Sequence, residues 1–351
     1  MKRLRKILFP FSILYGEIVE IRNKAFEKGM LSSNSFLTPT IVVGNLNVGG
    51  TGKSPQIEYL IRLLKGYSLA VLSRGYKRKS KGFQLADKSS TVSQIGDEPL
   101  QFYRKFENII VAVDTDRSNG IRQLEKLKKP PDIILLDDAF QHRKVKGGLN
   151  ILLTSFGDLY ADDFVLPTGN LREKRKGAER ANIIIVTKCP DDLTKKRQSE
   201  IILKLNIEPR QSVYFSTIEY HHSVISSKNK ISISELSAYK VLLVTGIANG
   251  DPLVNFLKEK NIDCKHLKFP DHHDFTELDK EKIMDTFDHI DSVKKILLTT
   301  EKDYVRSFSN HIKEFYYVPI QTKILEKEEE FNKQVLNYVR LNTVNRCVIK
   351  K

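Results

Sequence analysis

Cysteine is scarce in this chain of 351 residues. The three cysteines, Cys189, Cys264 and Cys347, stand far apart, and no pair has CxxC spacing. The sequence therefore gives no support for a disulfide scaffold or a zinc site, and a reducing, cytosolic setting fits best.

Long apolar runs are also missing near the N-terminus. The segment Ile7 to Tyr15 follows a basic stretch, but Pro10 interrupts it and two glutamates come soon after it. It is too short to span a bilayer, and no small-residue cleavage site follows. We therefore expect neither a secretory signal nor a transmembrane helix.

The same segment has the pattern of a helix that lies on a membrane surface. Its apolar side chains recur near one face, and its basic side chains are able to reach lipid phosphates. The apolar set is Ile7, Leu8, Phe11, Leu14, Ile18 and Ile21; the basic set is Lys2, Arg3, Arg5, Lys6 and Arg22. Ordinary packing of this face into the protein core is the alternative.

The charge of the chain favours an anionic partner. Lys and Arg exceed Asp and Glu to give a formal net charge of +15, which suits a phosphate, a nucleotide, a nucleic acid or an acidic membrane. The sequence has no zinc-finger, helix-turn-helix or aromatic RNA-binding pattern, and its basic residues are dispersed. We therefore expect no nucleic-acid partner, and no obligate protein partner is predicted.

Apolar runs of strand length alternate with helical stretches from Thr40 onward, which is typical of a parallel sheet covered by helices. The expected strands are 41–43, 68–72, 109–113, 133–136, 151–153 and 183–186. After a ribbon-like segment the pattern restarts with expected strands at 241–245, 264–269 and 296–298.

The predicted fold class is α/β: a three-layer domain with a parallel sheet and a phosphate-binding loop, a second, smaller α/β domain, and an N-terminal amphipathic helix. The expected ranges are 1–30 for the membrane-associating helix, 31–210 for the nucleotide-binding domain, and 211–351 for the smaller domain with a C-terminal helix and tail.

A glycine-rich loop directly follows the first strand and opens a helix. Successive backbone N–H groups in such a P-loop turn toward one anion, Lys53 reaches the outer phosphates, and Ser54 is able to ligate Mg²⁺. Asn47 stands where the strict pattern has glycine, although Asn tolerates left-handed backbone. The alternative is a glycine-rich turn without nucleotide. The predicted ATP-phosphate ligands are Asn47, Val48, Gly49, Gly50, Thr51, Gly52, Lys53 and Ser54.

Two carboxylates, Asp137 and Asp138, end the strand at 133–136. In an open parallel sheet this strand end lies at the same edge as the phosphate loop, so the pair is predicted to organise Mg²⁺ together with Ser54. A simple strand-ending turn is the alternative. Two further groups stay open at this point. Asp97 is a candidate base or a helix cap, and the polar cluster after a strand that contains His272 is a candidate surface loop, metal site or half of an acid–base pair.

The ordered set of motifs resembles the tetraacyldisaccharide 4'-kinase family of lipid A synthesis. The matching segments are 43–45, 49–55, 73–76, 96–99, 137–142 and 269–272. The resemblance implies ATP-dependent phosphorylation of the 4'-hydroxyl of a tetraacylated glucosamine disaccharide 1-phosphate, giving lipid IVA, at the cytoplasmic face of the bacterial inner membrane by a peripheral enzyme. It also implies that the smaller domain closes over the active site.

The resemblance assigns roles residue by residue. It gives Asp97 with His272 the role of base, it places Lys53, Asp137 and Asp138 in the catalytic machinery, and it gives substrate binding to Arg74, Tyr76, Asn170, Arg172 and Glu173. Lys174 departs from the proline that usually continues this substrate turn.

The alternative function is a P-loop GTPase or ATPase switch associated with the membrane. Its guanine-specific NKxD signature is absent, because in the similar segment 187–191 the residue Asp191 lies one position too far along.

Overall fold

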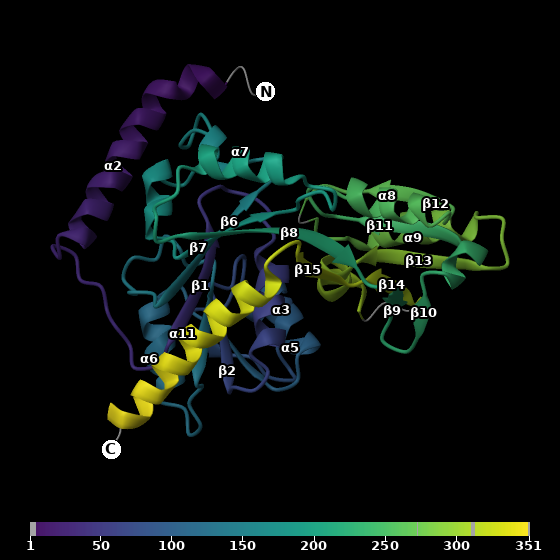
Figure 1. Cartoon of the computed structure of the whole chain (residues 1–351). Coiled ribbons are helices and arrows are strands. Elements are labelled where there is room, and N and C mark those ends of the chain that lie inside the picture. The colour runs from purple at the N-terminus through teal and green to yellow at the C-terminus, as the bar shows by residue number, and fades with distance from the viewer. Residues whose placement is uncertain (1–4, 272, 310–312, 350–351) are drawn as a thin grey trace. The chain divides into compact units, whose positions relative to one another are not determined.

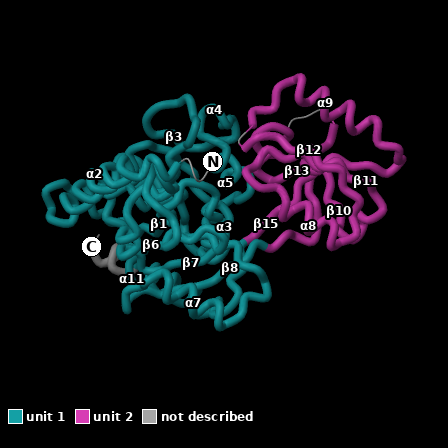
Figure 2. The backbone as a smooth tube through the Cα atoms, turned by 90° about the horizontal axis from the view of Figure 1, so that it is seen from above, with its two compact units in different colours: residues 1–218, 322–351 teal, residues 219–321 magenta. Residues whose placement is uncertain are grey.

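The computed structural model describes residues 5–271, 273–309 and 313–349, which form two compact units (Figure 2). Unit 1 lies within residues 1–218 and 322–351, and unit 2 lies within 219–321. The range expected for the smaller domain, 211–351, included residues 322–351. These residues belong to unit 1, because the C-terminal helix buries Phe331, Val335 and Val339 in the core of that unit.

Unit 1 is built on a nine-stranded sheet with the order β15-β8-β7-β6-β1-β5-β2-β4-β3. Seven of the strands, from β8 to β4 in this order, pair in parallel, and β3 joins β4 antiparallel. The strands are β1 (Thr40–Asn45), β2 (Leu69–Ser73), β3 (Gln84–Leu85), β4 (Ile109–Val113), β5 (Ile133–Asp137), β6 (Leu149–Ser155), β7 (Ile183–Thr187), β8 (Ser212–Tyr220) and β15 (Ile320–Ile324).

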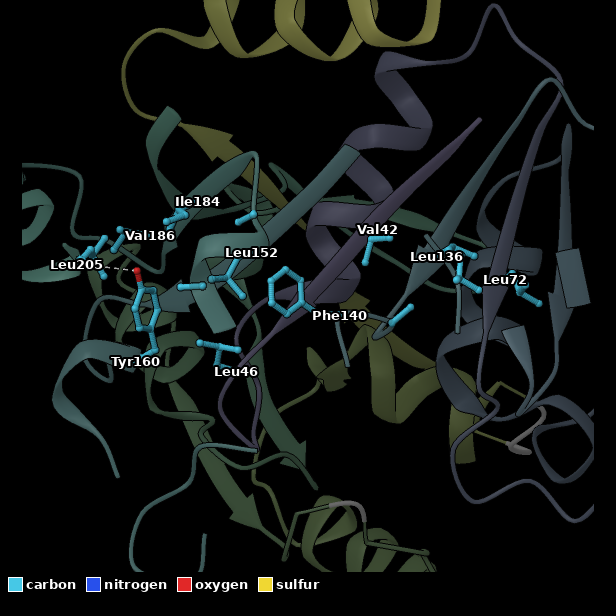
Figure 3. Close-up of a cluster of buried hydrophobic side chains, with 14 of the residues drawn as sticks. Val42, Leu46, Leu72, Leu136, Phe140, Leu152, Tyr160, Ile184, Val186 and Leu205 are labelled. Carbon is cyan, nitrogen blue, oxygen red and sulfur yellow. Dashed lines mark hydrogen bonds between the residues drawn. The ribbon is translucent and has the colours of Figure 1, made fainter. Parts of the chain in front are cut away.

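The central strands are apolar throughout because both faces of the sheet are covered. In β1, Ile41 and Val43 point into one core and Val42 into the other, as the two-residue period of a strand requires. Figure 3 shows the second core, in which Val42, Leu136 and Phe140 lie among side chains of several strands.

Helices close both faces of this sheet (Figure 1). One core includes side chains of α3, α5 and α11, and the other includes side chains of α6 and α7. These helices are α3 (Lys53–Leu63), α5 (Asp97–Lys105), α6 (Arg117–Glu125), α7 (Lys195–Leu205) and α11 (Glu328–Ile349), and α4 (Val92–Ile95) is a single turn before α5. The expected three-layer architecture is confirmed.

Unit 2 is a smaller α/β unit around a six-stranded sheet with the order β10-β9-β14-β13-β11-β12. Four neighbouring strands, from β14 to β12, are parallel, and β9 and β10 add an antiparallel ribbon. The elements are β9 (Ser223–Ile225), β10 (Lys230–Ser232), β11 (Lys240–Thr245), α8 (Asp251–Glu259), β12 (Cys264–Lys268), α9 (Glu277–Asp288), β13 (Lys295–Thr300), α10 (Glu301–Asp303) and β14 (Phe315–Val318). The predicted second α/β unit is thus present.

The chain passes between the two units twice, near residues 218–219 and 321–322. The strands that lead into these passages, β8 and β15, are neighbours in the sheet of unit 1.

The N-terminal helix α2 (Phe9–Glu27) is unusual in the face that it buries. Only Ser12 and Gly16 are buried, whereas most of its large apolar side chains are exposed. The exposed set includes Phe9, Phe11, Ile13, Leu14, Tyr15, Ile18 and Ile21. The alternative of ordinary core packing is therefore wrong for this face. Among the described residues, no helix combines the length and apolarity needed to cross a bilayer.

Candidate active site

The loop between β1 and α3 has the backbone of a phosphate cradle. Gly49 and Gly52 have φ angles of +127° and +84°, which L side chains rarely adopt. Asn47 does not have a positive φ, so left-handed tolerance is the wrong reason for its presence. Its backbone instead bridges to Leu171, and its side chain donates to Asp163 Oδ2 at 3.4 Å.

Two side-chain oxygens of this loop are buried without a hydrogen-bond partner, namely Asn47 Oδ1 and Thr51 Oγ1. Buried polar atoms are rarely left unsatisfied in a folded protein. An unpaired threonine hydroxyl inside a ring of glycines is therefore suited to donate to a bound anion.

Lys53 is the first residue of α3 and reaches back across the loop. Its Nζ lies 3.3 Å from Asn45 Oδ1 and 3.6 Å from Asp138 Oδ1. The ammonium group is thus held between the end of β1 and the residue that follows β5, at one edge of the sheet.

Asp137 ends β5 and is buried. Its Oδ2 accepts from Ser73 Oγ at 2.9 Å, and its backbone carbonyl accepts from Arg117 at 3.2 Å. Burial, with the nearby charges of Glu98 and Asp138, raises the pKa of the Asp137 carboxyl to about 7. Burial is the largest cause, because removing the carboxylate from water disfavours its charged form.

Asp138 follows in a left-handed backbone conformation with φ of +47°. A non-glycine residue rarely adopts this conformation unless its surroundings hold it there. Burial acts to raise the pKa of its carboxyl, but the cations of Lys53 and Arg172 outweigh burial and hold the pKa below its ordinary value.

Glu98 was not singled out from the sequence, although it stands in the motif at 96–99. Its Oε1 accepts from Ser54 Oγ at 2.8 Å, and its charge acts on Asp137. The adjacent Asp97 is buried and is the first residue of α5, whose N-cap is Gly96. Asp97 Oδ1 accepts from the backbone N–H of Glu98 at 3.0 Å, so the carboxylate also stabilises the start of this helix.

The segment 163–174, called here the substrate turn after the role that the resemblance leads us to expect, packs against the phosphate loop. Val48 N donates to Asn170 O at 2.7 Å, and Arg172 N donates to Leu46 O at 2.8 Å. The Arg172 side chain reaches Asp138, so the turn contacts both the loop and the carboxylate pair.

Glu173 of the substrate turn is buried and fully engaged by protein groups. Its Oε1 accepts from Gln141 at 3.0 Å and from Arg180 at 2.8 Å, and its Oε2 accepts from Asn23 of α2 at 2.9 Å. In this structure the residue links the turn to the 137–142 segment. Gln141 also donates to Asn45 O at 2.9 Å, a contact that the sequence did not predict.

The remaining predicted residues lie beside this cluster or outside the described chain: Arg74 directly follows Ser73, which donates to Asp137, and the Tyr76 carbonyl lies next to Gly96. Arg74 and Tyr76 follow β2 and have exposed side chains. His272 lies outside the described residues. Its neighbour His273, in unit 2, pairs with Asp279 at 2.9 Å.

The end of β7 also supports the phosphate loop, a contact that the sequence did not predict. Thr187 Oγ1 donates to Thr51 O at 2.8 Å, and the ammonium of Lys188 donates to the carbonyl of Gly50. Both residues lie in the segment that resembled an NKxD signature, so the segment contacts the loop without carrying that signature.

A parallel sheet, a glycine-rich loop that opens a helix, and a lysine between that loop and two strand-end carboxylates together define a P-loop protein that binds a nucleotide at this sheet edge. A family model described as "Tetraacyldisaccharide-1-P 4'-kinase" matches residues 4–340. The chain belongs to this family, and it is therefore a kinase.

Relatives and a solved structure agree with this assignment. A tetraacyldisaccharide 4'-kinase of Flavobacterium johnsoniae is 52% identical over 97% of this chain and 99% of its own, and one of Bacteroides thetaiotaomicron is 44% identical over 98% and 95%. A crystal structure of the "apo" form of LpxK from Aquifex aeolicus in complex with ATP has 30% identity and a TM-score of 0.77, covering 96% of this chain and 99% of that one. The alternative of a nucleotide-driven switch is not favoured.

Proposed function

We propose that this chain transfers the γ-phosphate of ATP to the 4'-hydroxyl of a tetraacylated glucosamine disaccharide 1-phosphate, giving lipid IVA. The observation that carries the proposal is the position of Lys53, between the phosphate loop and Asp138, in a chain of this kinase family. The acceptor is taken from the names of the relatives.

The phosphates of ATP are proposed to lie in the loop formed by residues 47–54. The unpaired hydroxyl of Thr51 and the backbone N–H groups of this loop suit phosphate oxygens. Lys53 is the cation that would hold the transferred group in line with its acceptor.

The donor set also fits Mg²⁺. Ser54 and Asp137 offer a hydroxyl and a carboxylate at one sheet edge, with Asp138 beside them, and the carboxylates of Glu98 and Asp138 lie close enough to add to the effect of burial on the pKa of Asp137. Within the described chain, no three His, Cys, Asp or Glu side chains form a metal site by themselves. Mg²⁺ commonly uses one or two carboxylates and completes its shell with phosphates and water. When bound, the ion would neutralise phosphate charge.

Asp97 is proposed to accept the proton of the sugar hydroxyl. It is buried next to Glu98 in the chain, and Glu98 accepts a hydrogen bond from Ser54 of the phosphate loop. His272, proposed from the family resemblance as the partner of this base, lies outside the described residues.

The substrate turn is proposed to hold the disaccharide or its phosphate. Asn170 and Arg172 lie next to the phosphate loop, and the buried Glu173 accepts a hydrogen bond from Gln141 that holds the turn in place. Arg74 and Tyr76, exposed after β2, are proposed to reach the same substrate.

The exposed apolar face of α2 is proposed to rest on the membrane that carries this lipid substrate, at the cytoplasmic face of the inner membrane. The inward side of α2 is polar, so burying its outward side in lipid removes apolar surface from water without opening the protein core.

The test is transfer of labelled γ-phosphate from ATP to purified tetraacyl disaccharide 1-phosphate in mixed micelles, with Lys53→Ala as the negative control. Label at the 4' position supports the proposal. Hydrolysis of ATP by the wild-type protein without labelled lipid would refute it.

A further inference from the structure

Most side-chain contacts of α2 are with the substrate turn, and the end of the helix also pairs with Arg143 through Glu27. Ser12 Oγ donates to Thr168 Oγ1 at 2.7 Å, and Arg5, just before the helix, donates to Pro167 O at 3.0 Å and to Asn170 Oδ1 at 3.1 Å. Phe9 meets Phe164 edge to face. The helix thus docks by a mostly polar stripe, and its partner is the segment that touches the phosphate loop.

Lys174 of the substrate turn contacts the middle of this stripe. Its ammonium lies 2.6 Å from Glu17 Oε1 and also pairs with Glu20 Oε2. Its stem crosses the helix at Gly16, where an added Cβ would lie 3.4 Å from Lys174 Cε. Two carboxylates of the helix therefore hold one cation of the turn.

The opposite side of the same turn orders the catalytic groups. The backbone of Arg172, two residues before Lys174, donates to Leu46 O at 2.8 Å, and its side chain holds Asp138. Glu17 and Glu20 thus hold Lys174, the backbone of the turn joins Lys174 to Arg172, and Arg172 holds the carboxylate of Asp138.

We propose that Lys174, clamped by Glu17 and Glu20 of α2, is a positioning residue that fixes the substrate turn so that Arg172 holds Asp138. The expected effect on kcat rests on the proposed phosphoryl transfer. The expected effect on the order of the substrate turn does not depend on it. The clamp gives α2 a second role besides contact with lipid: the helix sets the geometry of the site that would phosphorylate the lipid.

The matched control lies on the same helix. Lys24 pairs with Glu20 Oε1 at 2.7 Å from within α2 and has no described contact with the substrate turn. Lys24→Gln therefore removes a cation from the same carboxylate and leaves the clamp in place, whereas Lys174→Gln removes the clamp. Lys174→Arg keeps the charge and the reach.

The first readout is independent of activity. Hydrogen–deuterium exchange of the full-length protein in detergent micelles would follow the backbone N–H groups of Leu171 and Arg172, which donate to Phe164 O and Leu46 O. Each exposed ion pair contributes modestly, so we expect Lys174→Gln to speed exchange in peptides covering 163–174 by about two- to tenfold. Lys24→Gln and Lys174→Arg are expected to match the wild type.

The second readout is kinetic. In Lys174→Gln we expect kcat to fall by a similar factor of about two to ten, because the clamp acts on Asp138 through the turn. The turn also bonds to the phosphate-loop segment at Leu46 and Val48, so the KM for ATP is expected to rise by no more than the same factor. Lys174→Arg is expected to restore kcat.

Unchanged exchange in Lys174→Gln, or equal acceleration in Lys24→Gln, would overturn the proposal. So would a fall in kcat that Lys174→Arg does not restore. A wild-type protein that labels no lipid would refute the proposed function instead, and the exchange measurement would still decide whether the clamp orders the turn.

Discussion

The guanidinium of Arg172 donates to both carboxylate oxygens of Asp138, at 3.0 and 3.1 Å. Both bonds come from Nη1, and the planar guanidinium holds this nitrogen at a reach and direction that the shorter, flexible lysine side chain does not reproduce. We therefore expect Arg172→Lys to lower kcat by about tenfold and Arg172→Gln by on the order of 10²-fold. Steady-state assays with both variants test this, and full activity in Arg172→Lys would show that charge alone suffices.

Lys53 is the residue on which transfer should depend most. Lys53→Ala removes the cation between Asn45 and Asp138, so we expect kcat to fall by on the order of 10²–10³-fold while the protein remains folded. The matched control is Lys65→Ala, at an exposed position just after the same helix. Activity is measured with labelled ATP, and thermal unfolding of both variants checks the fold. A comparable loss in the control would contradict the assignment.

The exposed face of α2 should govern association with lipid. Phe11, Leu14 and Ile18 are 63%, 61% and 58% exposed, and we expect their combined replacement by serine to weaken binding to acidic vesicles by at least about tenfold. Leu203→Ser on α7 is the control, because Leu203 is 80% exposed but lies on another helix. Vesicle sedimentation measures the difference, and equal binding by the triple variant would contradict the proposed lipid contact.

His142 should make the stability of the protein depend on pH. Burial, with the nearby charge of Arg117, lowers its pKa to about 4, whereas an unfolded chain has a value near 6.5. Between these values the unfolded chain binds a proton that the folded chain does not, so the free energy of unfolding falls as the pH drops from 6.5 to 4. The expected loss is on the order of 2–3 kcal/mol.

His142→Gln provides the comparison for this pH effect, because glutamine does not titrate. Urea unfolding at pH 7 and pH 4.5 should show a smaller loss of stability in the variant than in the wild type. Identical losses in the two proteins would mean that another group carries the effect.

The sequence was sufficient to predict the strands that are buried on both faces. Short, continuous apolar runs such as 133–136 and 183–186 are typical of parallel strands that helices cover on both faces. It missed α6, whose sequence Arg117–Glu125 is polar and contains a glycine, and it missed β14 and β15, which are short and flank Pro319. These elements depend on tertiary packing more than on local pattern.

The candidate site also has a part that the sequence predicts and a part that it does not. The phosphate loop and the two strand-end aspartates were predictable, because local chemistry requires glycines, a lysine and carboxylates in that order. Two other contacts join segments that are far apart in the chain, so no local sequence pattern predicts them. They are the hydrogen bond of Ser54 to Glu98 and that of Lys188 to Gly50. The departure at Lys174 was visible in the sequence, but its two partners on α2 were not.

The double passage of the chain between the units determines how a protease would separate them. A single cut near 218–219 leaves the fragments covalently joined through 321–322, and the reverse also holds. Only two cuts release residues 219–321 as a separate piece. Because β8 and β15 are neighbouring strands, the ends left behind emerge from adjacent positions in the sheet, where a short engineered linker is able to rejoin them.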